Sequence, residues 1–190
     1  MKNWRKILVT GFGCLLLLGV LNGCTKGNQT TNPQTNKPDK QTTETTGKPA
    51  QIEKEVILYR LPQDGTQYFV AEKVKIKTTK GQEALDTLKA LVSTKPDKNV
   101  KALNPFPEKT QVLGLTVKNG VAKADFSKEF YKKGQGEYEV TMLFYSVADT
   151  LTEFPEIKKV QFLREGKNVD VFGQMDLTDP LERNKSYIKK

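Results

Sequence analysis

Histidine is absent from the 190-residue chain, and its two cysteines, Cys14 and Cys24, both lie near the N-terminus. The lack of imidazole excludes Ser-His triads, ordinary neutral-pH acid–base catalysis and most zinc sites. Because no cysteine follows position 24, the rest of the chain has no disulfide, no thiolate nucleophile and no CxxC motif. The sequence therefore lacks most of the side chains on which catalysis and metal binding depend, and we expect neither a cofactor nor a metal.

The N-terminal segment has the pattern of a lipoprotein signal. Positive residues are followed by an apolar run over residues 7–21, which has the length of a signal-peptide core and is short for a membrane span of about 20 residues. A leucine three positions before Cys24 and a glycine directly before it resemble the bacterial lipobox. The resemblance implies a signal peptide over residues 1–23 and a diacylglyceryl anchor on Cys24, at the extracytoplasmic face of the cell membrane. The alternative is an uncleaved anchor with an inert cysteine.

Residues 24–51 form a polar segment with almost no aliphatic side chains. They are rich in Thr, Asn, Gln, Lys and Pro, and such a segment cannot bury enough apolar surface to offset the entropy lost on folding. We therefore expect a disordered tether with a mean reach of about 30 Å. From Ile52 the pattern changes, and residues 52–190 have the length of one domain with one core.

Apolar residues either alternate or recur at helical spacing through residues 52–190. Alternation predicts strands, whereas apolar residues three and four positions apart predict helices. Strands are expected at residues 56–61, 68–77, 113–118, 121–126, 157–163 and 168–172, and helices at residues 81–94 and 136–154. The order ββαββαββ predicts an α+β fold, in which a mainly antiparallel sheet carries two helices on one face. Glu72 counts among the polar positions of its strand, and the tail after Gly173 is expected to be mostly loop.

Asn119 and Gly120 lie between two alternating runs. This is a strong hairpin signal, because both residues tolerate the positive φ of a type I′ turn. The turn predicts a register in which large residues face small ones, with the pairs Lys118–Val121, Val117–Ala122, Leu115–Ala124 and Leu113–Phe126.

Two long segments resemble the GerMN-domain family. The first, NPFPEKTQVLGLTVKNGVAKADFSKEF, has a proline-flanked loop, an Asn-Gly turn and a DFS motif. The second, TLTEFPEIKKVQFLREGKNVDVFGQMDLTDPLER, has TLT-x-FP before a strand, a glycine turn and D-x-x-x-P-L-x-R. The family positions are Asn119, Gly120, Asp125, Phe126, Ser127, Phe154, Pro155, Gly173, Asp176, Pro180 and Arg183.

The resemblance covers residues 56–183 and implies both a fold and a function. GerMN domains are similar to the ring-building modules of secretion-like channels, which pack against neighbours. The family consists of lipoproteins of spore-forming bacteria that are implicated in spore formation and germination. Its members usually carry two domains in tandem, whereas this chain has length for one. The resemblance implies a lipid-anchored, non-enzymatic scaffold of the envelope, which binds an envelope protein or further copies of itself.

Several of these positions have structural interpretations of their own. Ser127 is expected to cap a helical turn with its hydroxyl. Asp176 and Asp179 are expected to cap a turn, with a calcium site as the alternative. Arg183 is expected to pair with one of these two carboxylates. The aromatic core is expected to include Phe144, Phe154, Phe162 and Phe172.

Two alternatives to the scaffold interpretation remain. One is a ligand-binding or wall-binding module that regulates a peptidoglycan-remodelling enzyme. The other is a cell-wall glycosidase, because that chemistry needs only two carboxylates. The formal net charge of +9 indicates a solvated basic surface, or else attraction to anionic lipids or wall polymers. Nucleic acid is not expected as a partner outside the cytoplasm.

Overall fold

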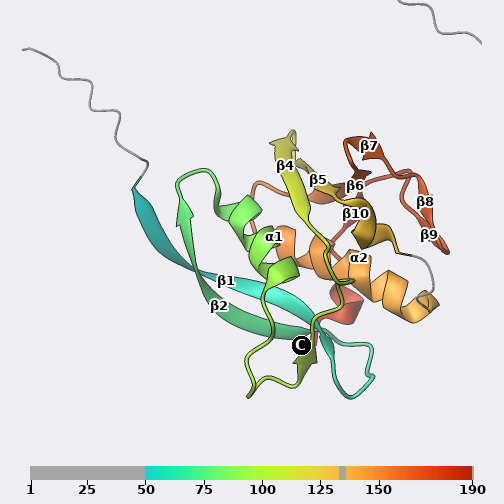
Figure 1. Ribbon diagram of the computed structural model, residues 1–190, viewed down its shortest axis with the longest axis horizontal. Coiled ribbons are helices and arrows are strands. Elements are labelled where there is room, and N and C mark those ends of the chain that lie inside the picture. Colours follow the sequence, from blue (N-terminus) through green and yellow to red (C-terminus); the bar gives the residue numbers. More distant parts are fainter. Residues whose placement is uncertain (1–49, 133–135, 190) are drawn as a thin grey trace, which may run out of the picture. The chain divides into compact units, whose positions relative to one another are not determined.

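The computed structural model describes residues 50–132 and 136–189 (Figure 1). The predicted signal peptide, Cys24 and nearly all of the predicted tether lie outside the described residues, so these predictions are not tested by the fold. None of the helices within the described ranges is both long enough and apolar enough to cross a membrane.

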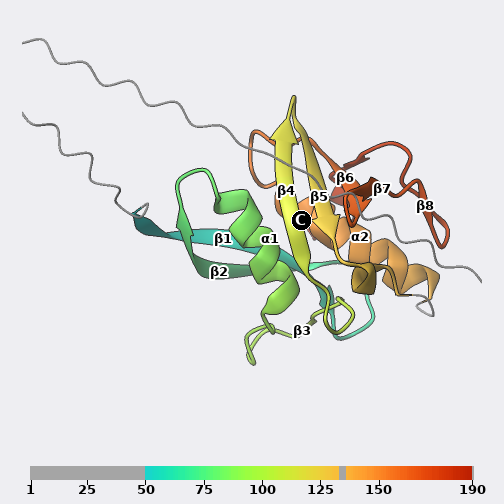
Figure 2. The same cartoon turned by 45° about the horizontal axis from the view of Figure 1, so that its top comes forward.

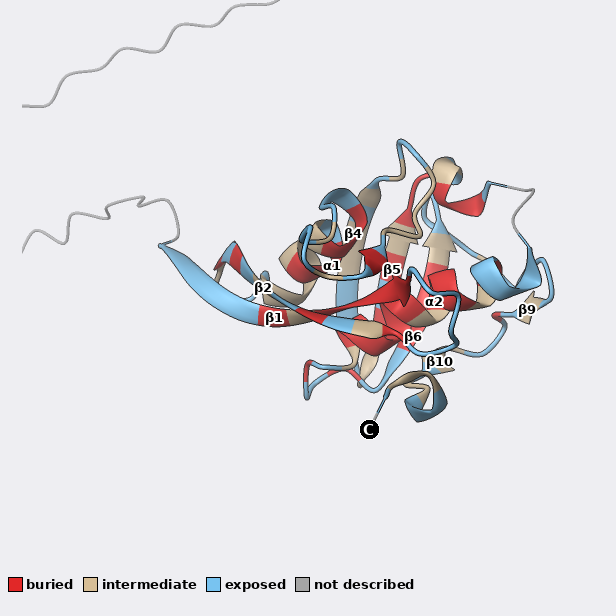
Figure 3. Ribbon diagram, turned by 90° about the horizontal axis from the view of Figure 1, so that it is seen from below, coloured by how far each residue is buried: buried red, intermediate tan, exposed pale blue. Residues whose placement is uncertain are grey.

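The first half of the fold is a long hairpin followed by a helix. β1 (Gln51–Pro62) and β2 (Val70–Thr79) pair antiparallel. The first five residues of β1 are exposed, and the strand becomes buried from Val56 onward (Figure 3). α1 (Glu83–Ser93) follows, and the short β3 (Ala102–Leu103) pairs with the end of β1. Of the predicted apolar stripe, Leu88, Leu91 and Val92 are buried, whereas Leu85 is only partly buried.

A tight hairpin opens the second half, as predicted. β4 (Val112–Lys118) and β5 (Val121–Phe126) are joined by Asn119 and Gly120, whose φ angles of 52° and 79° are those of a type I′ turn. The three predicted pairs nearest the turn are confirmed.

The fourth predicted pair is wrong. A β-bulge between Val112 and Gly114 shifts the register, so that Phe126 faces Val112 instead of Leu113. The bulge inserts an extra residue into the strand and turns it away from the ladder. Leu113 is consequently 49% exposed.

A helical crossover then leads to a parallel strand. The 3₁₀ turn η1 (Lys128–Tyr131) and α2 (Glu137–Leu151) connect β5 to β6 (Lys159–Arg164), which pairs parallel to β5. A parallel pair requires a crossover of this kind, because the chain must return to the same end of the sheet before the next strand begins.

The last part of the chain differs from the prediction. Instead of one strand over residues 168–172, β7 (Lys167–Asn168) pairs briefly with β6, and β8 (Val171–Phe172) pairs with β9 (Met175–Asp176). The tail then forms β10 (Leu181–Glu182), which also pairs with β6, and the 3₁₀ turn η2 (Lys185–Tyr187). Strands of two residues are too short to give a periodic signal.

The α+β class and the two helices are confirmed, and the sheet is more divided than the sequence indicates. The principal strands form two sheets, ordered β2-β1-β3 and β10-β6-β5-β4. α2 contacts β1 of the first sheet and both β6 and β10 of the second. α1 contacts β1, β2 and β4, and Figure 2 shows it beside β4. The helices therefore join the two sheets, and buried residues occupy ten positions of α2.

Aromatic rings fill the centre of this arrangement. Phe126 stacks on Phe130 with ring centroids 4.1 Å apart, and Phe144 meets Phe162 edge to face at 4.8 Å. These four rings are essentially inaccessible to solvent, and such pairs contribute about 0.5–1.5 kcal/mol each beyond the apolar area that they bury. The predicted aromatic core is confirmed, with Phe154 also buried and Phe172 packed at its edge.

Candidate functional site

The family positions at the end of β5 hold the neighbouring turn in place. Oδ1 of Asp125 accepts a hydrogen bond from the Gly166 N–H at 3.0 Å. The Phe126 carbonyl accepts another from the Glu165 N–H, also at 3.0 Å. Both turn residues have positive φ, 50° at Glu165 and 80° at Gly166. The acidic and aromatic residues of the DFS motif therefore join one strand end to the turn that follows β6.

Ser127 lies at the N-cap position of η1, but its hydroxyl makes no capping hydrogen bond, so that prediction is wrong. Oγ of Ser127 instead accepts from the Gln111 N–H at 3.1 Å, and the Ser127 N–H donates to the Gln111 carbonyl at 3.0 Å. The ladder between β4 and β5 ends at Val112 and Phe126. The hydroxyl therefore extends the hairpin by satisfying the next backbone donor.

A second group of family positions lies at the opposite end of β5. The Gly120 carbonyl accepts hydrogen bonds from the N–H groups of Lys158 and Lys159, at 2.7 and 3.1 Å, and so positions the start of β6. Phe154 is 6% exposed in the core, and the adjacent Pro155 is exposed. The family positions are thus divided between two ends of the strand and do not converge on one cleft.

The family positions after β7 lie in the segment that leads the chain back to pair with β6. Gly173 has a φ of 60°, and a Cβ there would lie 3.7 Å from a methyl group of Val140. Oδ1 of Asp176 accepts from the Thr178 N–H at 3.0 Å, a hydrogen bond that lowers the pKa of this carboxyl. The turn cap predicted at Asp176 is confirmed, whereas no such hydrogen bond to Asp179 is found among the described residues. Across residues 50–132 and 136–189, no group of three His, Cys, Asp or Glu residues could hold a metal ion. Pro180 directly precedes β10.

Arg183 does not pair with Asp176 or Asp179, so that prediction is wrong. Its guanidinium forms an ion pair with Glu153, which follows α2. It also donates to the Tyr59 hydroxyl at 2.5 Å and to the Asp149 carbonyl at 3.3 Å. Arg183 therefore fastens the end of β10 to α2 and β1.

Asp149 is the most unusual group in this cluster. Its side chain is completely buried, Oδ1 accepts from the Asn184 N–H at 2.8 Å, and Oδ2 has no hydrogen-bond partner in the described part of the chain. Burial raises the pKa of Asp149 to about 7, although the Asn184 N–H and the Arg183 charge act against the shift. Burial and the hydrogen bond to Glu153 likewise raise the pKa of Tyr59 to about 12.

A perturbed carboxyl beside an arginine and a tyrosine is a pattern found in active sites, but structural ion pairs produce it too. Here Asp149 has no surface to offer a substrate, and the nearest second carboxylate, Glu153, is bound to Arg183. A glycosidase needs both carboxyl groups to reach the same glycosidic bond. The arrangement instead holds the C-terminal segment of the domain against α2.

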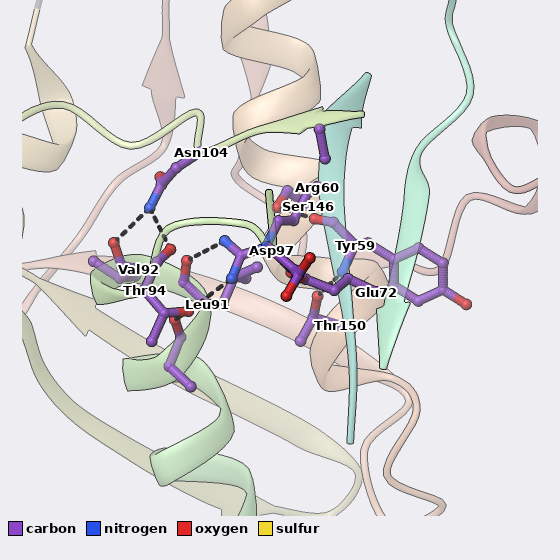
Figure 4. Close-up of polar contacts among 12 residues, drawn as sticks. Tyr59, Arg60, Glu72, Leu91, Val92, Thr94, Asp97, Asn104, Ser146 and Thr150 are labelled. Carbon is purple, nitrogen blue, oxygen red and sulfur yellow. Dashed lines mark hydrogen bonds and ion pairs between the residues drawn. The ribbon is translucent and has the colours of Figure 1, made fainter. Parts of the chain in front are cut away.

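Arg60 is the centre of a second polar network, on the far side of β1 (Figure 4). It is fully buried and forms an ion pair with Glu72, which is 6% exposed. It also donates to the Leu91 carbonyl at 3.3 Å and to Oγ1 of Thr94 at 2.7 Å. Oε1 of Glu72 accepts from the Asp97 N–H at 2.8 Å. The network ties the first hairpin to the end of α1. Glu72, which counted among the polar positions of its strand, is buried within this network.

Sequence reasoning did not identify Tyr59, Arg60, Asp149 or Glu153. A signal was present for two of them, because Arg60 interrupts an apolar strand and Asp149 interrupts the apolar pattern of a helix. Charged residues are almost never fully buried unless paired, so each of these positions predicts a partner. The identity of the partner is not contained in the local pattern.

A known protein family matches a large part of this sequence. The sequence model of the Germane family, described as "Sporulation and spore germination", matches residues 57–170. The chain belongs to the Germane family. The match begins within β1 and ends after β7, so it includes both helices and the hairpin with its Asn-Gly turn. No curated protein matches the chain.

Solved GerMN domains share the Germane fold of this chain. The first GerMN domain of the sporulation protein GerM from Bacillus subtilis is 28% identical, with a TM-score of 0.56 over 68% of this chain and 97% of that one. The tandem GerMN domains of the same protein are 26% identical, with a TM-score of 0.57 over 69% of this chain. The match spans 46% of the tandem protein's chain, which is about half its length.

Within this Germane domain, the surface hollows are open rather than enclosed. One, of about 690 Å³, lies beside Tyr131, Arg164 and Phe172, and another, of about 530 Å³, lies beside Tyr68 and Phe69. A ligand site is normally concave and buries most of its ligand, with a few polar groups that converge on it. Polar residues line both hollows, among them Glu165, Lys167 and Asp170 in the first and Asp64 and Lys101 in the second, but both hollows open to solvent.

The outer strand of the larger sheet is a different kind of surface. Among the described residues, β4 is the last strand in its sheet and its ladder partner is β5, while α1 also contacts it. It exposes Leu113 and Val117, at 49% and 42%. An unpaired strand edge presents backbone donors and acceptors to another chain, and the exposed apolar side chains add buried area on contact. This edge is the candidate interaction site of the domain.

Proposed function

We propose that this protein is a lipid-anchored, non-enzymatic assembly component of the cell envelope that acts in sporulation or spore germination. The observation that carries the proposal is a Germane domain, matched over residues 57–170, that follows a sequence resembling a lipobox that ends at Cys24. Two acyl chains give stable anchoring, whereas one is marginal. A polar tether over residues 24–51 would allow the domain to reach about 30 Å from the membrane surface.

The use of the polar side chains supports a role without catalysis. Arg183 and Glu153 bind each other, Arg60 binds Glu72, and Asp125 and Asp176 each accept a backbone hydrogen bond. These groups stabilise turns and the contacts between strands and helices. Their charges and hydrogen bonds are already used within the domain. A purified domain that releases fragments from peptidoglycan would contradict this part of the proposal.

The edge of β4 is the surface through which the domain would contact an envelope partner or a second copy. Its bulge at Leu113 limits unselective strand pairing, so a partner must match the interrupted ladder. Hydrophobic contacts with Leu113 and Val117 would then select the partner.

The anchor is tested on the native protein. Mass spectrometry of the N-terminal peptide should find a chain that begins at Cys24 and carries a diacylglyceryl group, and Cys24→Ala should remove the protein from the membrane fraction. An unmodified sulfur, or a leader that is still attached, would reject the anchored interpretation.

The contact surface is tested by crosslinking and affinity purification from sporulating and vegetative cells. The double variant Leu113→Lys/Val117→Lys should lose the captured envelope partner or the self-crosslink. The matched control is Val171→Lys, which changes another exposed apolar residue (65% exposed) outside β4 and should capture normally. Equal capture by both variants would exclude the β4 edge, and binding to isolated cell wall without any protein partner would favour the wall-binding alternative.

A further inference from the structure

The C-terminal segment, residues 183–189, lies across a small aromatic cluster that is separate from the main core. This cluster contains Tyr59, Leu61, Phe69 and Met142, with Tyr145 partly buried beside it. Tyr187 covers it by packing edge to face against Phe69 at 6.0 Å and against Tyr145 at 5.3 Å. The segment therefore closes an apolar surface formed by α2 and β1.

Few backbone hydrogen bonds hold this segment. The Phe69 N–H donates to the Tyr187 carbonyl at 2.7 Å, next to a single parallel bridge between Phe69 and Ile188. At the other end, the Asn184 N–H donates to Oδ1 of Asp149 at 2.8 Å. Short segments with few ladder bonds open locally at much lower free energy than core strands. Arg183, at the start of the segment, adds an ion pair with Glu153 and hydrogen bonds to the Tyr59 hydroxyl and the Asp149 carbonyl. The Asn184 contact is the attachment that ends on the Asp149 carboxyl group.

That attachment depends on a carboxyl group in an unusual position. When the segment is closed, Asp149 is completely buried and its Oδ2 has no partner within the described residues. An ionised carboxylate with an unsatisfied oxygen is costly in such a place. Opening of the segment would hydrate the group and remove that cost.

We infer that residues 183–189 are a strap that closes over the aromatic cluster when Asp149 is protonated and is released when Asp149 ionises. Release would uncover Phe69, Tyr145 and Met142 next to the first hairpin. The domain would then have an apolar surface in addition to the edge of β4.

The charged and titratable groups around Asp149 do not account for a pH-dependent release by changing their own charge. The strap contributes Arg183, α2 and the turn after it contribute Tyr145 and Glu153, and β1 contributes Tyr59. Arginine stays protonated in this range. Burial raises the pKa of both tyrosines, to about 12 for Tyr59, so both stay neutral at pH 8.

The sign of the effect follows from proton linkage. The closed state holds the Asp149 proton with a pKa of about 7, against an ordinary value of 3.8 once the group is exposed. A raised pKa in the closed state favours closure most at low pH, and this advantage is lost as the pH rises through 7. Between pH 5 and pH 8 the opening equilibrium should therefore increase about 100-fold.

Amide hydrogen exchange of the full chain in detergent tests this inference. After correction for the intrinsic rate, protection of the Phe69 and Asn184 amides should fall about 100-fold from pH 5 to pH 8, while protection of Val147 in α2 stays constant. In Asp149→Asn, which keeps the oxygen for Asn184 and removes the charge, the fall should disappear. The matched control is Asp125→Asn, another carboxylate that accepts one backbone N–H, and it should behave as wild type.

Three outcomes would overturn the inference. The first is wild-type protection at Phe69 and Asn184 that is the same at pH 5 and pH 8. The second is a fall that persists in Asp149→Asn. The third is a parallel loss of protection at Val147, since it would mean that the whole domain opens and that the strap is not an independent element.

Discussion

Removal of the Arg60 side chain tests the buried network of the first hairpin. Arg60 is completely buried and holds three acceptors: the Glu72 carboxylate, the Leu91 carbonyl and Oγ1 of Thr94. Arg60→Met keeps most of the volume but leaves the Glu72 charge buried, with only the Asp97 N–H as a partner. Loss of one partner from a buried ion pair costs about 3–5 kcal/mol. For a domain of this size, the melting temperature should fall by roughly 10–20 °C.

The double variant Arg60→Met/Glu72→Met separates the ion pair from simple packing. Once both charges are replaced by apolar groups, no uncompensated charge stays buried, and such replacements are often close to neutral. The double variant should therefore be more stable than Arg60→Met by about 2 kcal/mol, as measured by urea unfolding followed by circular dichroism. The reasoning is refuted if Arg60→Met costs less than about 1 kcal/mol, or if the second substitution adds a further loss.

Two further predictions concern the family positions. Gly120→Ala should lower stability by about 1–2 kcal/mol, because φ is 79° there and the new Cβ would lie 3.3 Å from the Lys158 side chain; an unchanged urea midpoint would contradict this. Asp125→Ala should cost about 1 kcal/mol and selectively raise amide exchange at Gly166, whose N–H loses its acceptor; retained protection at Gly166 would show that another group holds the turn.

Local chemistry accounts for the elements that sequence analysis placed correctly. The Asn119-Gly120 turn determined the register of three residue pairs, because a type I′ turn matches the twist of the flanking strands and Asn-Gly favours it. Apolar spacing likewise located α1 and α2. The register failed at Leu113, where a bulge depends on how β4 meets the rest of the sheet.

Partners distant in sequence account for most of the errors. Arg183 was expected to bind a nearby aspartate, yet it binds Glu153, 30 residues away. The Ser127 hydroxyl was expected to cap its own helical turn, yet it satisfies Gln111, 16 residues earlier. Each side chain had possible local partners, and the fold brought a distant group within hydrogen-bonding distance instead.

The sequence by itself determined the α+β class, the two helices and the β4–β5 hairpin. It also determined that the chain has no imidazole and, beyond position 24, no thiol. These properties depend only on residue type and on spacing along the chain. The tertiary structure alone decided that β6 lies parallel to β5, that Arg60 and Asp149 are buried, and that the C-terminal segment covers an aromatic cluster. The physical reason is that a charge or an amide is satisfied by whatever folding brings within about 3 Å of it, and local periodicity carries no information about that neighbour.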